Sequence, residues 1–442
     1  MKIVGLIAEY NPFHNGHEYH IRKAKEVTGA DAAIVIMSGD YVQRGIPAIM
    51  PKRLRARMAL LSGADAVFEL PVCYSTASAE LFAEGAVSFL EQLSVVDYLC
   101  FGSECNDLAG MKHIADILYK EPDGYRKSLQ EYLKTGNSFP AARQMALSSY
   151  LNQNKTAAIL NEPNNILGIE YLKALRKFGS DIRPFTIRRL ESGYHDQTLC
   201  DTYSSASAIR ALLSPAVPSA KTSGSPFTPA SQICMDERIS GKSATDSLRT
   251  VPDELKGQIP EKCLVLLKER YGTEFPIDAD DFSLLLKYRI LTTTAEELIS
   301  FSDVSEELAN RISRQINNYL NYTQFSGLLK TKELTQTRIN RALLHILIGI
   351  KKDSLAEFTD NGYHFYARLL GFRKDSEHLI SAASKRGKLQ VLASPGRNED
   401  ISPCGQNMLR QDILASSLYN SVVTDKFRTA FQNEYSQKVI KL

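Results

Sequence analysis

Five short apolar runs, separated by stretches with helical periodicity, dominate the first two hundred residues. The runs are apolar nearly throughout and rich in residues that favour strands. Strands buried on both faces read in this way, because helices cover both sides of a parallel sheet. Their alternation with helices favours an α/β fold of the Rossmann-like, doubly wound kind. We predict strands at residues 2–8, 32–37, 66–70, 96–102 and 182–187, and helices at 17–27, 52–62, 77–92 and 163–178.

The 442 residues are too many for one ordinary core, and composition divides them into three stretches. Residues 1–213 carry the alternating pattern. Residues 214–250 are rich in Ser, Thr, Pro and Gly, so we interpret them as an insertion or linker. Residues 251–442 read as a mainly α-helical C-terminal domain, with one helix expected over 336–352 and a short strand or helix at "ARLLGF".

Charge and cysteine usage exclude several classes of protein. The net charge is only +3, so any basic surface must be local. Seven dispersed cysteines without a Cys-x-x-Cys pair fit reduced thiols better than disulfides or a zinc site. The N-terminal run reads as a strand, and no apolar run approaches membrane-spanning length. We therefore expect a cytoplasmic protein that does not cross a membrane.

The first candidate site is "HNGH", between the first expected strand and the first expected helix. His14 and His17 flank Gly16 at a turn where a helix N-terminus favours anions. Glycine lets another group approach the backbone closely, and imidazoles there can donate hydrogen bonds to phosphate oxygens. The pattern predicts a phosphate-binding turn at the ligand edge of the sheet.

A second phosphate site is predicted at "YSSASAIRALL". Ser205 and Ser207 lead into a helix whose first turns carry Arg210. Hydroxyls and N-terminal amides bind oxygens, and the guanidinium neutralises charge. The alternative is an ordinary N-capped surface helix.

Other polar residues follow expected strands and should face the same crevice. Arg188 and Arg189 come after the last strand, and Gly102 after the fourth. At the start of the helix near 163, one of Asn164 and Asn165 is expected to cap and the other to bind a ligand.

The sequence leaves the roles of two further polar or basic segments open. Residues 43–45 read as a mobile loop over the site, and the role of Asp40 stays open. The basic residues Lys52, Arg53, Arg55 and Arg57 begin a helix and read as a solvated face, or alternatively as a guide for a nucleic-acid backbone.

Together these motifs resemble a known family. "HNGH" and "SSASAIR" resemble the two signatures of the His-x-Gly-His nucleotidyltransferase superfamily, although Ala206 stands where that superfamily usually has a serine. "GLIAEYNPFHNGH", "VIMSGDYVQRGIPAI", "GADAVFELP", "FGSE", "PNNILGIEYLKAL" and "TRINRALLHILIGI" resemble the bacterial tRNA(Met) cytidine acetate ligases over most of the chain.

The resemblance implies an enzyme that activates acetate with ATP, with Mg²⁺ as companion ion, and acetylates the wobble cytidine of elongator tRNA(Met) to N4-acetylcytidine. It implies His14 and His17 as catalytic residues. The ATP-binding residues that it implies are Ile7, Ala8, Glu9, Tyr10, Asn11, Pro12, Phe13, His14, Asn15, Gly16, His17, Glu18, Tyr19, His20, Gly102, Asn165, Arg188, Arg189, Ser205, Ser207 and Arg210. A tRNA partner fits Arg338, Arg341, Lys351 and Lys352, which fall on polar positions of the helix expected over 336–352. No residue is predicted to bind a metal, and the oligomeric state stays open.

Two alternatives remain. A small-molecule adenylyltransferase that makes a nucleotide cofactor would share both phosphate motifs. A non-catalytic RNA-binding protein could use the nucleotide fold as a scaffold. A P-loop or zinc enzyme is disfavoured, because no Gly-x-x-x-x-Gly-Lys-Ser/Thr loop or paired cysteine cluster occurs.

Overall fold

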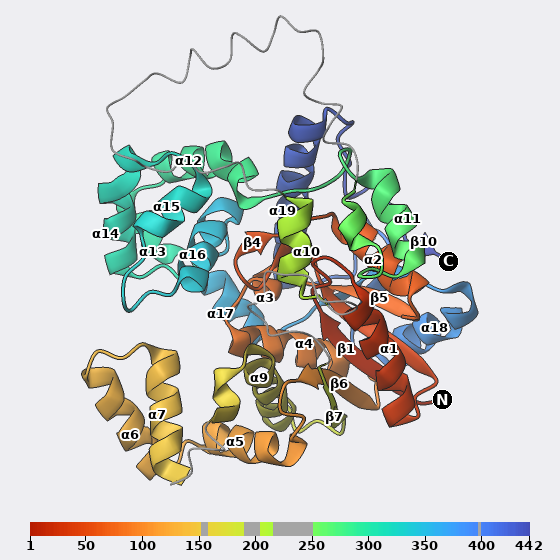
Figure 1. Cartoon of the computed structure of the whole chain (residues 1–442), viewed down its shortest axis with the longest axis horizontal. Helices are drawn as coiled ribbons and strands as arrows, with labels where there is room; N and C mark the ends of the chain where they lie inside the picture. The colour runs from red at the N-terminus through yellow and green to blue at the C-terminus, as the bar shows by residue number, and fades with distance from the viewer. Residues whose placement is uncertain (152–157, 190–203, 215–250, 397–398) are drawn as a thin grey trace, which may run out of the picture.

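A computed structural model describes residues 1–151, 158–189, 204–214, 251–396 and 399–442 of the chain. Of the stretch predicted as an insertion, Ser214 is described and residues 215–250 lie outside this part. An eight-stranded sheet organises the described residues (Figure 1). Its strands are β1 (Ile3–Ala8), β2 (Ala32–Ser38), β5 (Ala66–Leu70), β6 (Tyr98–Ser103), β7 (Arg183–Arg188), β8 (Tyr366–Phe372), β9 (Gln390–Leu392) and β10 (Ile440–Lys441). They lie in the order β10-β8-β5-β2-β1-β6-β7, with β9 beside β8.

All five predicted strands are confirmed, and these five pair in parallel. The sheet as a whole is mixed, because β8 runs antiparallel to β5. Residues 366–441, which the sequence assigned to a helical domain, supply β8, β9 and β10 to the same sheet. The sheet therefore crosses the expected boundary between the two domains.

Alternate residues of the central strand β2 enter two separate cores. In β2, Ile34 and Ile36 belong to one apolar cluster, and Val35 and Met37 to the other. The period of two gives this strand two apolar faces, which explains its nearly continuous hydrophobic sequence. On one face pack α1 (Asn15–Thr28), α2 (Lys52–Leu61) and α11 (Glu261–Arg270); on the other pack α4 (Ala79–Leu93), α9 (Pro163–Lys177) and α19 (Pro403–Phe427).

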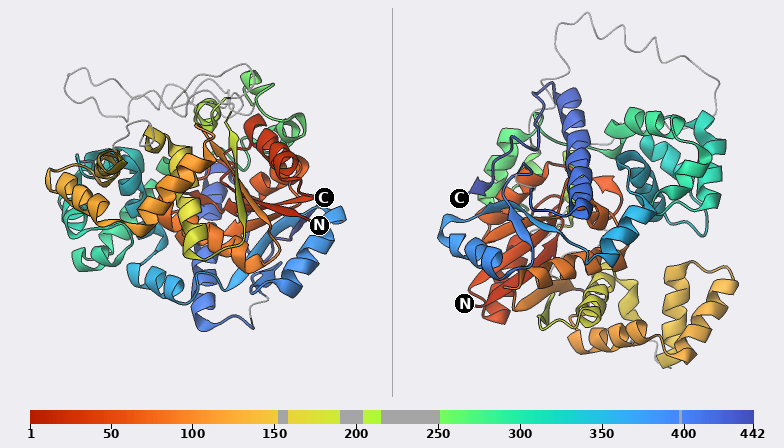
Figure 2. Two further views of the ribbon diagram at one scale, coloured as in Figure 1. Left: turned by 90° about the horizontal axis from the view of Figure 1, so that it is seen from below. Right: turned by 180° about the vertical axis from the view of Figure 1, so that it is seen from behind.

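Two helical groups extend from this body (Figures 1 and 2). The first, which the sequence did not predict, comprises α5 (Leu108–Lys120), α6 (Asp123–Lys134) and α7 (Phe139–Leu151). The second comprises α12 (Ser283–Leu291), α13 (Ala295–Ser300), α14 (Glu306–Gln315), α15 (Tyr322–Leu328) and α16 (Gln336–Ile348). A hairpin of β3 (Tyr41–Val42) and β4 (Ile46–Pro47) lies between the sheet and α16. The remaining elements are α3 (Val72–Ser75), α10 (Ala206–Leu213), α17 (Lys352–Asp360), α18 (Glu377–Arg386), η1 (Ala158–Asn161), η3 (Asp253–Leu255), η4 (Ala279–Phe282), η5 (Ile316–Asn318) and η6 (Lys374–Ser376).

The single helix expected over 336–352 is wrong. Helix α16 ends at Ile348, and its C-cap Gly349 has φ 81°, in the left-handed region that ends helices. Lys351 is then the N-cap of α17, and Lys352 is its first residue. The basic residues 338–352 therefore lie on two helices.

The solvated basic face expected at the start of α2 is also wrong for two of its members. Lys52 and Arg55 are buried, whereas Arg57 is exposed. The Lys52 ammonium lies 2.8 Å from Glu69 and 3.0 Å from Glu434, and it donates to the Ser416 hydroxyl at 2.7 Å. Burial raises the pKa of Glu69 to about 7 in spite of the attraction of Lys52. Lys52 is thus the cation that holds two buried carboxylates together.

Asp40, whose role the sequence left open, belongs to the same buried group. Its Oδ1 accepts the backbone N–H of Lys52 at 2.8 Å, and its Oδ2 lies 3.8 Å from the Lys52 ammonium. The carboxylate therefore stabilises the start of α2 and does not line the cavity described below.

We expect Lys52→Met to lower the free energy of unfolding by about 3–5 kcal/mol, because it leaves buried carboxylates without their cation. Arg57→Met, on the exposed face of the same helix, is the matched control and should change stability by less than about 0.5 kcal/mol. Urea denaturation of both variants checks this expectation. Equal stability of the two variants would contradict it.

Candidate active site

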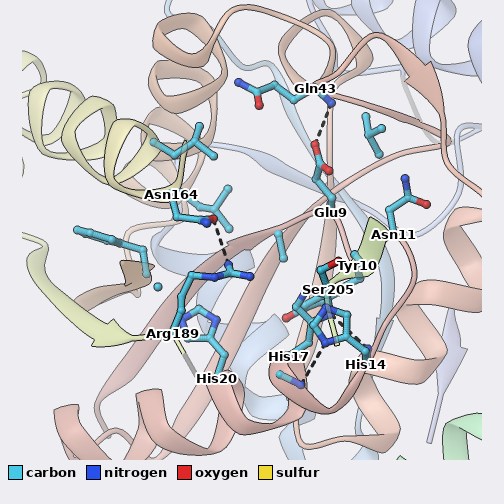
Figure 3. Close-up of a pocket in the computed structure, with 18 of the residues that line it drawn as sticks. Glu9, Tyr10, Asn11, His14, His17, His20, Gln43, Asn164, Arg189 and Ser205 are labelled. Carbon is cyan, nitrogen blue, oxygen red and sulfur yellow. Dashed lines mark hydrogen bonds between the residues drawn. The ribbon is translucent and has the colours of Figure 1, made fainter. Parts of the chain in front are cut away.

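A cavity of about 220 Å³ opens where the carboxyl ends of β1, β6 and β7 meet the N-terminal ends of α1 and α10 (Figure 3). Ligands of open α/β sheets bind at this edge. Most of the residues predicted to bind ATP line this cavity. They are Ile7, Ala8, Glu9, Tyr10, Asn11, His14, Gly16, His17, Tyr19, His20, Gly102, Arg188, Arg189, Ser205, Ser207 and Arg210.

Five predicted residues, Pro12, Phe13, Asn15, Glu18 and Asn165, do not line the cavity. The Phe13 ring packs on Tyr10, with 4.8 Å between ring centroids. The Asn15 side chain donates to the Gly257 carbonyl at 2.6 Å. These positions give the side chains packing and anchoring contacts outside the cavity.

Of the two asparagines at the start of α9, Asn164 lines the cavity and Asn165 does not. Asn165 is buried, and its Oδ1 accepts from the Ser103 hydroxyl at 2.8 Å and from the Glu104 backbone at 3.0 Å. These contacts join the end of β6 to the start of α9. The prediction that Asn165 faces the ligand is therefore not supported, and Asn164 lines the cavity in its place.

Sequence reasoning missed several lining residues because they read as ordinary core positions. Apolar side chains near strand ends and on core-facing helices show no chemical signature. Three polar lining residues were considered from the sequence: Gln43 and Arg44 as part of a loop over the site, and Asn164 as one of two candidate ligand-binding asparagines. The missed residues are Val42, Ile46, Phe82, Phe101, Leu167, Tyr171, Ile187 and Ala206.

His14 and His17 form a reciprocal cap at the start of α1. The Nδ1 of His14 accepts the Gly16 backbone N–H at 3.1 Å, and the Nδ1 of His17 accepts the His14 backbone N–H at 3.3 Å. Their rings stack with 3.7 Å between centroids. Because Nδ1 is an acceptor in both rings, the neutral tautomers carry their proton on Nε2. Each histidine can therefore donate one hydrogen bond from Nε2.

Burial keeps the two histidines of α1, His17 and His20, neutral. It lowers the pKa of His17 well below its usual value, and the nearby charges of His14, Arg189 and His20 act in the same direction. Burial, aided by Arg189, lowers the pKa of His20 to about 4. Near neutral pH both rings are uncharged hydrogen-bond donors, and arginines supply the positive charge at the site.

The second predicted motif meets the first directly. Ser205 caps α10 by accepting the Ala208 backbone N–H at 3.1 Å. Arg210 donates to the Ser207 hydroxyl at 3.0 Å and to the Asn11 carbonyl at 2.6 Å. Arg210 thus joins the start of α10 to the turn before α1, and two helix N-termini face one cavity.

A further arginine at the cavity, Arg189, follows the end of β7. The guanidinium of Arg189 donates to Asn164 Oδ1 at 3.1 Å (Figure 3). The amide of Asn164 in turn donates to Glu104 at 2.5 Å, which fixes the orientation of its oxygen. The Arg189 side chain lies against Gly102, where a Cβ would be 3.2 Å from Arg189 Cγ. Gly102 therefore leaves room for this arginine.

The segment predicted as a mobile loop is the β3–β4 hairpin, and it packs tightly. Its Gln43 backbone N–H donates to Glu9 Oε1 at 2.9 Å. A Cβ on Gly45, whose φ is +74°, would lie 2.2 Å from the backbone nitrogen of Arg341 on α16. Tyr322 also donates to the Gly45 carbonyl at 3.4 Å. The hairpin is thus one wall of the cavity and a contact surface for the helical group.

The four residues predicted to bind tRNA differ in their surroundings. Arg338 and Lys351 are exposed. Arg341 pairs with Asp303 through hydrogen bonds of 2.8 and 3.2 Å, so the expectation that its charge is open to a partner is wrong. Lys352 is exposed, but its ammonium donates to the carbonyls of Ile299 and Val304.

The described residues lack two features that would point to other functions. No cluster of three or more His, Cys, Asp or Glu side chains there is arranged to hold a metal ion. No helix in that part of the chain combines the length and apolar character that a membrane crossing requires. The cysteines placed there, Cys73, Cys100, Cys105, Cys263 and Cys404, are free thiols.

Comparison with known proteins identifies the class that this fold and site define. The family described as HIGH Nucleotidyl Transferase matches residues 1–434. A tRNA(Met) cytidine acetate ligase of Acetivibrio thermocellus is 37% identical, with 100% of each chain covered. A protein of the same name from Thermoanaerobacter sp. is 38% identical over 95% of each chain.

Solved structures give the same result. TmcAL of Thermotoga maritima in its apo form superposes with a TM-score of 0.86, at 30% identity and with 100% of both chains covered. The same protein bound with alpha-thio ATP gives a TM-score of 0.84, again at 30% identity and full coverage. The chain belongs to the tRNA(Met) cytidine acetate ligase family of HIGH nucleotidyl transferases.

The capping contacts change what a histidine variant should do. His14→Ala removes an N-cap acceptor and should cost about 1 kcal/mol of stability. His14→Asn supplies another cap oxygen and should melt close to the unmutated protein. Both variants, and His17→Ala, should lower ATP–pyrophosphate exchange by about 10²-fold or more, because a preorganised donor is lost. Exchange and thermal melting are measured together. Unimpaired exchange in His14→Asn would refute the donor role of His14.

Proposed function

We propose that this chain is an ATP-dependent tRNA(Met) cytidine acetate ligase that works in the cytoplasm. One observation carries the proposal: Arg210 joins the two phosphate motifs around one cavity, in a chain matched along its whole length by ligases of that name. The substrates are ATP, acetate and elongator tRNA(Met), and the products are N4-acetylcytidine in the tRNA, AMP and pyrophosphate.

In the first step, an oxygen of acetate attacks the α-phosphorus of ATP and expels pyrophosphate. Acetate is already ionised at neutral pH, so this step requires no base. It requires alignment and charge neutralisation. His14 and His17 donate to phosphate oxygens from Nε2, while the N-termini of α1 and α10 favour the negative charge. Arg188, Arg189 and Arg210 supply positive charge at the same cavity.

The donor set of the cavity indicates how Mg²⁺ would bind. Mg²⁺ is usually held by one or two carboxylates together with substrate phosphates and water. Glu9 is the one carboxylate among the described residues that line the cavity. These residues fit an ion held mainly by the phosphates of ATP, to whose charge it would contribute neutralisation.

In the second step, the exocyclic amine of the cytidine attacks the carbonyl carbon of acetyl-adenylate and displaces AMP. The tRNA must then approach the cavity from a side that offers cations. The exposed Arg338, Lys351 and Lys352 on α16 and α17 are proposed to contact its phosphates, while Arg341 mainly maintains the ion pair with Asp303.

The proposal is tested with ATP, labelled acetate and total tRNA. We expect pyrophosphate release that depends on acetate, and label retained in tRNA as N4-acetylcytidine. Exchange that depends instead on a phosphorylated metabolite would favour a small-molecule adenylyltransferase. No pyrophosphate release with any of these substrates would leave the alternative of an RNA-binding scaffold.

The tRNA surface has its own prediction. Changing Arg338 and Lys351 together to Gln should weaken tRNA binding and reduce its salt dependence, by about 0.7–0.9 log units per lost phosphate contact. Adenylate formation should not change, because Arg338 and Lys351 do not line the cavity in which we propose that ATP binds. The measurement is tRNA affinity at two salt concentrations. An unchanged affinity in a variant that melts normally would contradict this surface.

Arg341→Gln is the informative comparison. It removes the partner of Asp303. Burial raises the pKa of this carboxyl, but the hydrogen bonds and charge of Arg341, together with the charges of His345 and Arg338, bring it below its usual value. Loss of this partner should lower the free energy of unfolding at pH values above the usual pKa of an aspartate, where the Asp303 carboxylate is charged. The effect should shrink as the pH falls through the lowered pKa of Asp303 in the folded protein.

A further inference from the structure

Glu9 occupies a distinctive position in the cavity. It is the first residue after β1, and the described lining of the cavity contains no second carboxylate. The other charged lining residues there are Arg44, Arg188, Arg189 and Arg210. An uncompensated anion beside a polyphosphate weakens the binding of that polyphosphate, and an ion held mainly by the phosphates of ATP does not require this carboxylate, so its presence points to a different task.

The side chain and the backbone of Glu9 are each held by one hydrogen bond. Its Oε1 accepts the Gln43 backbone N–H at 2.9 Å, and its own carbonyl accepts from Arg55 at 2.6 Å. In the part of the chain that the structure describes, no group donates to Oε2. The carboxylate is therefore held in place with one oxygen available to a substrate proton.

The carboxylate lies at the opposite side of the cavity from the phosphate motifs. Figure 3 shows it pointing toward Gln43 and away from His14 and His17. Gln43 belongs to the hairpin that packs on α16 through Gly45. This side of the cavity thus faces the helical group, from which we expect the tRNA to approach.

The two proposed steps differ in their need for a proton acceptor. The attack of acetate on ATP releases no proton, whereas the attack of an amine does. A cytidine amine is a weak nucleophile because its lone pair is delocalised into the ring, so proton removal must accompany formation of the N–C bond.

We propose that Glu9 is the general base of the transfer step, an inference that rests on the proposed function. The amine nitrogen of cytidine forms a bond to the acetyl carbon, and one N–H proton passes to Glu9 Oε2. The C–O bond to the phosphoryl group breaks, and AMP leaves with that electron pair. Protonated Glu9 then returns the proton to water. In this role the carboxylate contributes only after acetyl-adenylate has formed.

Glu9→Gln separates the two steps. Glutamine keeps a carbonyl oxygen for the Gln43 N–H but loses the ability to take a proton at neutral pH. We expect acetate-dependent ATP–pyrophosphate exchange within about threefold of the unmutated rate. Transfer from preformed, enzyme-bound acetyl-adenylate to tRNA should be slower by about 10²-fold or more in a single turnover. Binding of tRNA should not change.

Glu26→Gln is the matched control, because Glu26 on α1 is exposed and, among the described residues, forms its ion pair with Lys23. It should leave both rates unchanged. Equal loss of exchange and transfer in Glu9→Gln would mean that Glu9 serves ATP binding, and unimpaired transfer would mean that it is not the base; either result overturns the proposal. If Glu9→Gln does not fold, Glu9→Asp decides: its carboxylate is withdrawn by one methylene, so transfer should fall by at least about tenfold with exchange retained.

The failure of the proposed function looks different. If the unmutated protein shows neither acetate-dependent exchange nor labelled tRNA, the ligase function itself is wrong. If both occur and only the Glu9 variants behave unexpectedly, the error lies in the role of Glu9.

Discussion

The cavity depends on the buried guanidinium of Arg55. It donates to the Glu9 carbonyl at 2.6 Å, to the Ser38 carbonyl at 3.0 Å and to the Met50 carbonyl at 3.0 Å, and also to the Gly39 carbonyl. These carbonyls lie where β1 and β2 end and where the chain enters α2. Such carbonyls would be buried without partners if the guanidinium were lost, at a cost of about 1–3 kcal/mol each. One planar cation with five donors thus holds the sheet edge from which the cavity is built.

The sheet edge held by Arg55 places hydrogen-bond donors on one side of the cavity and the Glu9 carboxylate on the other. Neutral Nε2–H donors, two helix N-termini and Arg210 gather near the turn before α1. Neutral histidines suit this place, because burying further charged groups beside Arg189 and Arg210 would be costly without a bound anion. They can still donate hydrogen bonds when negative charge develops on a phosphate. The arginines therefore carry the permanent positive charge at the cavity, and the neutral histidines contribute directional hydrogen bonds.

Local sequence patterns predicted five strands and placed both motifs proposed to bind phosphate at one cavity, because each is encoded within about ten residues. The antiparallel pairing of β8 with β5 was not predictable, since Val67 and Gly371 meet across three hundred residues without a local signal. Burial of Lys52 and Arg55 was missed for a related reason. A basic helix start is usually solvated, and only the distant Glu69, Ser416 and Glu434 make this one an interior site. Gly349 was the local sign that α16 ends, but the apolar pattern around it outweighed that sign.

The hairpin β3–β4 connects the nucleotide fold to the helical group by close contacts. Gly45 meets the backbone of Arg341 so closely that no side chain fits between them, and Tyr322 donates to its carbonyl. Two residues earlier, the Gln43 N–H fixes Glu9. A displacement of α16 would therefore be transmitted through two residues of hairpin to the carboxylate. In the proposed reaction, whose second substrate is a folded RNA, this short path would orient the base toward the helical group from which we expect the RNA to approach. The groups proposed to bind phosphate lie at the far side of the cavity, where α1, α10 and the contact between Arg189 and Asn164 hold them.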